Sequence, residues 1–196
     1  MHNTSSAVIR LSDDLEAKAA FARHLEEEVG TEVRACYQCG KCSAGCPISF
    51  AMDYQPRQVV RMVQLGLKDR VLSCSTIWLC ASCNTCSTRC PRGVKITEVM
   101  DALRHQARRE QVTPKEVDVA KLHDSFLESI RSNGRVHEVG MILGFKKATG
   151  RWLEDAALGQ KMFFAGKLSL TPHKIKNLGA VKKIYSRIKE MEGNAR

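Results

Sequence analysis

The sequence has no long hydrophobic run and few aromatic residues. Phe, Trp and Tyr together make up 6% of the 196 residues, which leaves few large rings for a thick core. Apolar runs such as Met141-Ile142-Leu143 fall far short of the roughly 18–20 residues that span a bilayer. The N-terminal stretch also lacks the apolar segment of a secretory signal. We therefore expect a cytoplasmic protein that is not integral to a membrane.

No segment shows the two-residue alternation of a strand, and the apolar spacing instead indicates helices. Clear helices are expected over Ser12–Val29, Pro56–Gly66 and Ile96–Arg109, the first with Ser12 as its cap. Thr113-Pro114-Lys115-Glu116 has the form of a helix start, with the helix running to Ser132. Weaker patterns predict helices over 148–158 and 181–191. The fold class predicted is all-α.

Cysteine is the residue present in excess, with nine in a chain too long to need disulfide staples. Eight of the nine fall into two copies of the pattern Cys-x2-Cys-x2-Cys-x3-Cys-Pro. The copies are CYQCGKCSAGCP and CASCNTCSTRCP. A [4Fe–4S] cube needs one thiolate at each iron, and three cysteines spaced by two residues can wrap one cube face. The motif cysteines are Cys36, Cys39, Cys42, Cys46, Cys80, Cys83, Cys86 and Cys90.

The fourth cysteine of such a loop ligates the other cluster in two-cluster ferredoxins. Crossed ligation here predicts a first cluster on Cys36, Cys39, Cys42 and Cys90. The second cluster would take Cys80, Cys83, Cys86 and Cys46. The clusters would then be close neighbours, as an electron relay requires.

Zinc and disulfides are the alternative uses of these cysteines. Zinc usually takes two separated Cys-x2-Cys pairs, whereas each loop here adds a third cysteine and a late Cys-Pro. Cys74 lies outside the pattern and is expected to be a small buried residue near the second cluster. Helices before, between and after the loops favour an α-helical ferredoxin module over a βαβ-type ferredoxin.

The loops with PRQVVRMVQLG and GVKITEVMDALR closely resemble the C subunit of heterodisulfide reductase, over about residues 30–135. The resemblance implies a cytoplasmic α-helical protein with two [4Fe–4S] clusters on the eight motif cysteines. It further implies electron transfer between the A subunit, which bears flavin and iron–sulfur clusters, and the disulfide-reducing B subunit, which carries CCG domains. The resemblance also allows a hydrogenase or dehydrogenase module that supplies electrons through the A subunit. Iron–sulfur subunits of glycerol-3-phosphate or succinate dehydrogenases are the alternative.

The expected organisation is an N-terminal helix over 1–30, the ferredoxin domain over 31–112 and a helical basic extension over 113–196. Residues 141–196 carry twelve basic and four acidic residues. This charge suits docking on an acidic neighbouring protein, and no nucleic-acid partner is expected, because no nucleic-acid-binding fold signature accompanies it. A metal-stabilised nucleic-acid-binding protein, or clusters with a purely structural role, remain alternatives. No catalytic residue is predicted: the protein would carry electrons within an oxidoreductase.

Overall fold

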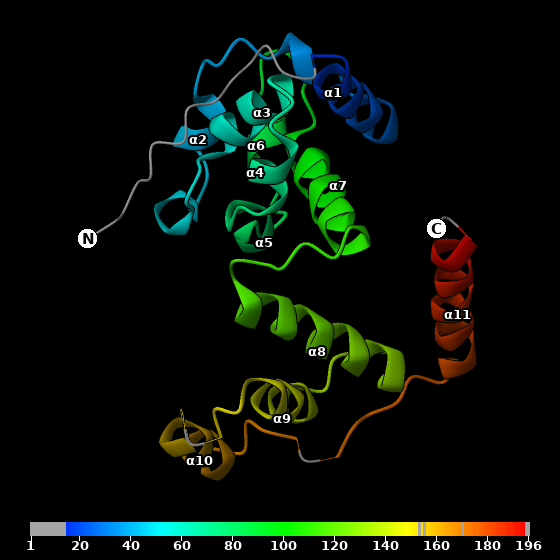
Figure 1. Ribbon diagram of the computed structural model, residues 1–196. Coiled ribbons are helices and arrows are strands. Elements are labelled where there is room, and N and C mark those ends of the chain that lie inside the picture. The colour runs from blue at the N-terminus through cyan, green and yellow to red at the C-terminus, as the bar shows by residue number, and fades with distance from the viewer. Residues whose placement is uncertain (1–14, 153, 155, 170, 195–196) are drawn as a thin grey trace. The chain divides into compact units, whose positions relative to one another are not determined.

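A computed structural model describes residues 15–152, 154, 156–169 and 171–194 (Figure 1). Over these residues the chain is all-helical, without a strand, which confirms the predicted fold class. The chain divides into two compact units, Met1–Glu116 and Val117–Arg196. No described helix is both long and apolar enough to cross a membrane. The expected boundaries after residues 30 and 112 stay predictions.

The first unit is built around two long helices and the segments between them. Its elements are α1 (Leu15–Val29), η1 (Val33–Ala35), α2 (Lys41–Ala44), η2 (Ser49–Ala51), α3 (Pro56–Gln64), α4 (Lys68–Leu72), α5 (Thr76–Leu79), α6 (Thr85–Thr88) and α7 (Ile96–Arg109). Helix α7 packs against α1, α4, α5 and α6. The core is mostly aliphatic, with Phe21 and the fully buried Trp78 as aromatic members. The guanidinium of Arg108 lies over the Trp78 ring, 5.4 Å from its centroid.

The expected helices of the first unit are present. Helix α7 has the predicted bounds, and Gly66 ends the α3 region in a left-handed conformation at φ +64°. That conformation lets the N–H groups of Gly66 and Leu67 bond back to the carbonyls of Val63 and Met62. The predicted cap Ser12 lies outside the described residues. Helix α1 ends at Val29, before Gly30, as expected.

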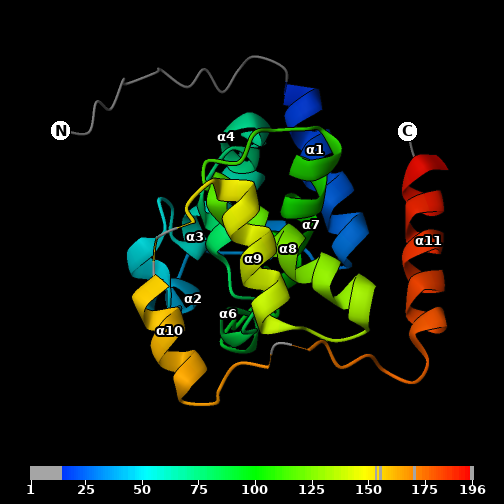
Figure 2. The same cartoon turned by 90° about the horizontal axis from the view of Figure 1, so that it is seen from below.

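The second unit contains α8 (Val117–Asn133), α9 (Glu138–Thr149), α10 (Ala156–Phe164) and α11 (Leu178–Asn194). Helices α8 and α9 pack side by side, and both views show this (Figures 1 and 2). His137 joins three segments. Its N–H donates to Ser129 Oγ at 2.8 Å, its Nδ1 accepts from the Gly140 N–H, and its Nε2 lies 2.9 Å from the Ser169 carbonyl oxygen.

Two helix predictions in the C-terminal half need correction: one helix is present but starts later than expected, and the other prediction is wrong. The helix expected from Thr113 begins at Val117, because Lys115 reaches back to Asp53 and residues 113–116 form a connector. The helix expected over 148–158 does not exist, because Gly150 ends α9 in a left-handed conformation at φ +76°. Helix α10 then begins at Ala156. The expected helix over 181–191 lies within α11.

Candidate iron–sulfur site

The eight motif cysteines line two pockets in the first unit. Three cysteines of the first loop, Cys36, Cys39 and Cys42, line the first pocket together with Cys90 from the second loop. The second pocket is lined by Cys80, Cys83 and Cys86 together with Cys46 from the first loop. Both pockets are partly open to solvent. Each pocket therefore takes its fourth thiol from the other loop.

The two loops share one backbone design. Gln38 and Ser82, each two residues after the first cysteine of its loop, have positive φ angles of 63° and 48°. Gly40 and Asn84 also take the left-handed conformation and precede the short helices α2 and α6. Asn and Gly adopt this conformation more readily than other residues. The turn chemistry of each loop therefore curls three cysteines around one pocket.

Matching serines fix both loops to the long helices that follow them. The Ser43 hydroxyl accepts the Arg57 N–H at 3.1 Å, and the Ser87 hydroxyl accepts the Thr97 N–H at 3.0 Å. Arg57 and Thr97 are the second residues of α3 and α7, where helix N–H groups lack partners within the helix. Each serine thus satisfies a helix start and places the third cysteine of its loop.

The first cysteine of each loop is fixed through its carbonyl group. Gln64 of α3 donates its side-chain amide to the Cys36 carbonyl at 2.9 Å. Arg104 of α7 donates to the Cys80 carbonyl at 3.1 Å and to the Ile77 carbonyl at 2.7 Å. The two halves therefore repeat one scaffold, with matching residues 44 apart in the loops and 40 apart in the helices.

Sequence reasoning recognised the repeated cysteines but missed these anchors. Ser43 with Ser87, and Gln64 with Arg104, occupy matching positions of the two halves. The sequence repeat continues beyond Pro47 and Pro91 into the helices that follow. The spacing between matching residues changes there from 44 to 40, because the connector of the second half is four residues shorter. Matching polar residues at that offset would have indicated paired structural roles.

The thiols differ in electrostatic environment. Burial raises the pKa of the Cys42 and Cys80 thiols, whereas hydrogen bonding with Thr85 lowers the pKa of the exposed Cys83 thiol. Hydroxyl groups lie 3.4 Å from two sulfurs of the second pocket, Thr85 beside Cys83 and Thr97 beside Cys86. Such contacts stabilise a thiolate, the form that binds metal.

The donor set suits a [4Fe–4S] cube at each pocket. None of the nine cysteines forms a disulfide. Among the described residues, no three thiols, imidazoles or carboxylates are arranged to hold a single metal ion. A cube takes one thiolate at each of four separate irons, so four thiols distributed around a pocket are suitable donors. Metal binding by these particular cysteines stays a prediction.

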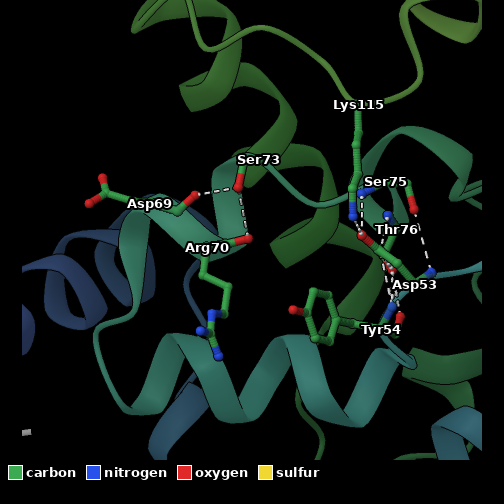
Figure 3. A network of polar contacts seen from close by, with 8 residues as sticks. All are labelled: Asp53, Tyr54, Asp69, Arg70, Ser73, Ser75, Thr76 and Lys115. Atoms are coloured by element: carbon green, nitrogen blue, oxygen red, sulfur yellow. Dashed lines mark hydrogen bonds and ion pairs between the residues drawn. The ribbon is translucent and has the colours of Figure 1, made fainter. Parts of the chain in front are cut away.

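A polar cluster centred on Asp53 connects the segments that lead to the two pockets (Figure 3). The Asp53 carboxylate accepts the N–H groups of Ser75 and Thr76 at 3.0 and 3.1 Å, and Lys115 Nζ lies 3.0 Å away. Burial alone would raise the pKa of Asp53, but these hydrogen bonds hold it well below its usual range. The cluster fixes the connector after the first loop against the start of α5.

Cys74 is buried at 2% exposure and lines neither pocket. Burial raises the pKa of its thiol. It therefore belongs to the core beside the Asp53 cluster. The expected burial is confirmed, and its nearness to the second cluster stays a prediction.

The second unit exposes apolar and basic side chains together. Residues 156–189 carry eight Lys and Arg residues and no Asp or Glu. Phe164, at 78% exposure, ends α10 beside Phe163. Ile184 and Ile188 are exposed one turn apart on α11. An apolar, positively charged surface of this kind suits an acidic protein partner.

Residues 32–94 match the family of the 4Fe-4S dicluster domain, and this range includes all eight motif cysteines. The match supports two [4Fe–4S] clusters and electron transfer as the general activity. It covers both loops and helices α2 to α6, and it ends just before α7.

Curated relatives extend this comparison. The iron–sulfur C subunit of CoB–CoM heterodisulfide reductase from Methanopyrus kandleri is 46% identical over 82 residues, 42% of this chain and 43% of that protein. A second C subunit of that name, from Methanocaldococcus jannaschii, is 48% identical over 83 residues, 42% and 44% of the two chains. The C subunit of the H2:CoB–CoM heterodisulfide,ferredoxin reductase of Methanothermobacter marburgensis is 38% identical over 87 residues, 44% and 47%.

The alignments span less than half of each of these three relatives. Within that span, the expected resemblance to the C subunit of heterodisulfide reductase is confirmed. The names of the relatives place them in an oxidoreductase complex.

Proposed function

We propose that the chain is the electron-transfer subunit of a heterodisulfide-reductase-like complex, with two adjacent [4Fe–4S] clusters. The observation that carries this proposal is the sharing of thiols between the two pockets, each lined by three cysteines of one loop and one of the other. The resemblance to heterodisulfide reductase C subunits over the same residues supports the type of complex. In this proposal the chain itself makes and breaks no substrate bond.

The ligands proposed are Cys36, Cys39, Cys42 and Cys90 for the first cluster. For the second cluster they are Cys46, Cys80, Cys83 and Cys86. When bound, each cluster supplies a site that accepts and releases one electron. The chain contributes by holding the thiols in place through Ser43, Ser87, Gln64 and Arg104. Aliphatic side chains such as Ile48 and Met100 restrict water at the second pocket.

The proposed partners are the flavin-bearing A subunit of such a complex and its disulfide-reducing B subunit. Helices α10 and α11 each expose basic and apolar side chains, which supports docking on an acidic protein, and we place this contact with one of these two proteins rather than with nucleic acid. Thiol ligands need a reducing compartment, so the complex is placed in the cytoplasm.

Anaerobic iron and acid-labile sulfide analysis, with EPR of the dithionite-reduced full chain, tests the proposal. We expect about eight irons and eight sulfides per chain, four of each per cluster. The reduced protein should give an EPR spectrum of two interacting spins, because the clusters are neighbours. The matched variant Cys74→Ser should keep the full iron content, whereas Cys42→Ser should lose iron. Zinc without sulfide would contradict the proposal.

A further inference from the structure

The two halves of the first unit differ in charge at matching positions of the pocket walls. Lys41 begins α2 as Thr85 begins α6, and Arg57 is the second residue of α3 as Thr97 is of α7. Lys41 and Arg57 line the first pocket, whereas Thr85 and Thr97 line the second. Because the backbone anchors are the same in both halves, the halves differ here in charge rather than in scaffold.

The two cations are not paired with any carboxylate of the described residues. Neither Lys41 nor Arg57 forms an ion pair with a carboxylate in the part of the chain that the structure describes. Arg104, which holds the second loop, has its guanidinium 3.3 Å from the Asp101 carboxylate, which offsets part of its positive charge. Arg89 of the second loop lies beside the backbone of the first loop and lines neither pocket. Of the described residues, none that lines the second pocket is charged.

Uncharged polar groups lie close to sulfur atoms at both pockets, so they distinguish the two pockets less than the charged residues do. The side-chain amide of Gln38 lies 3.5 Å from the Cys36 sulfur, and the Thr85 and Thr97 hydroxyls lie 3.4 Å from sulfurs of the second pocket. These groups are dipoles, whereas Lys41 and Arg57 carry full charges. A cluster gains one negative charge on reduction, so a nearby cation stabilises its reduced form.

We propose that Lys41 and Arg57 give the cluster at the first pocket the higher reduction potential, so that an electron entering the pair comes to rest there. This inference rests on the proposed function, because it needs both clusters. One electron leaves the second site and one arrives at the first, with no bond made or broken and no proton taken up. The direction of transfer inside the protein then runs from the pocket of Cys80 to the pocket of Cys36.

The test is a potentiometric EPR titration of the anaerobic full chain and of its Arg57→Thr variant. Threonine is chosen because Thr97 occupies the matching position in the second half. We expect the higher midpoint to fall while the lower one stays in place. The equilibrium constant for reduction should fall about threefold to tenfold, and tenfold corresponds to about 59 mV for one electron. High salt should reduce the difference, because Arg57 is exposed.

Two further variants control the experiment. Arg57→Lys keeps the charge and should restore most of the wild-type midpoint. Arg70→Thr removes an exposed cation of α4 that lines neither pocket, so it should leave both midpoints nearly unchanged. Lys41→Thr should lower the same midpoint as Arg57→Thr. It is the test variant to use if the Arg57→Thr protein has a low iron content.

An Arg57→Thr protein with its full iron content and both midpoints unchanged, or with the lower midpoint displaced, would overturn the inference. A wild-type protein without iron and sulfide would instead overturn the proposed function. The two failures are therefore distinguishable by the iron analysis.

Discussion

At the scale of single residues, Asp53 stabilises the fold mainly by accepting hydrogen bonds from two buried backbone N–H groups. Ser75 and Thr76 are almost fully buried, so their N–H groups would lack a partner without the carboxylate. An unsatisfied buried donor costs about 1–3 kcal/mol. We expect Asp53→Ala to lower the free energy of unfolding by about 2–4 kcal/mol. Anaerobic thermal melts measure this, with Asp69→Ala, an exposed acid of α4, as the control.

The same residue predicts a pH dependence. The pKa of Asp53 lies below its ordinary value of 3.8 in the folded chain. Its stabilisation is therefore fully present above pH 3.8 and is lost as the pH falls further towards the folded pKa. The difference in melting temperature between wild type and Asp53→Ala should be constant from neutral pH to about pH 5 and shrink below pH 4. A difference that grows on acidification would contradict this role.

At the scale of elements, the end of α3 is sensitive to substitution, because Gly66 lies against Lys18 of α1. A Cβ atom at Gly66 would lie 2.3 Å from the Cβ of Lys18 and 2.5 Å from its Cα, and φ is +64°. Gly66→Ala combines left-handed strain with a clash between helices, so we expect a loss of about 2–5 kcal/mol in unfolding free energy.

Gly30→Ala is the matched control for Gly66→Ala. Gly30 also has a positive φ, +63°, but a Cβ there would meet open space. Only the strain remains, at about 1–2 kcal/mol. Equal melting temperatures for the two variants would show that the contact between α1 and α3 does not limit stability.

The sequence allowed α1, α3 and α7 to be predicted because their apolar spacing, Pro56 and Gly66 are local signals. The grouping of the cysteines was also predictable from spacing. The start of α8 was not, because Lys115 bonds to Asp53, 62 residues away, and no local pattern encodes such a contact. Gly150 shows the opposite case: its signal was local, yet a helical pattern on both sides concealed it.

At the scale of the whole molecule, both pockets lie entirely in the first unit. Every residue that lines them falls between Cys36 and Met100. A chain ending after Glu116 keeps these residues and also Lys115 with its Asp53 partner. We expect it to hold the same iron and sulfide per chain as the full protein. Removing residues 117–196 should weaken binding to an acidic partner protein, because that segment carries the basic surface.

Iron analysis and pull-down with the partner proteins measure the two effects separately. Loss of iron on truncation would show that the second unit takes part in holding the clusters. Undiminished partner binding would move the docking surface to the first unit.

The exchange of one cysteine between the two loops has a consequence for how the protein matures. Cys46 and Cys90 each lie in one loop and line the pocket of the other. A loop that has not yet folded leaves its own pocket without three thiols and the other pocket without one, so neither proposed cofactor can be inserted fully before both loops are in place. With the proposed ligands, we expect maturation to be a single cooperative event, in which damage to one cofactor exposes the other to loss.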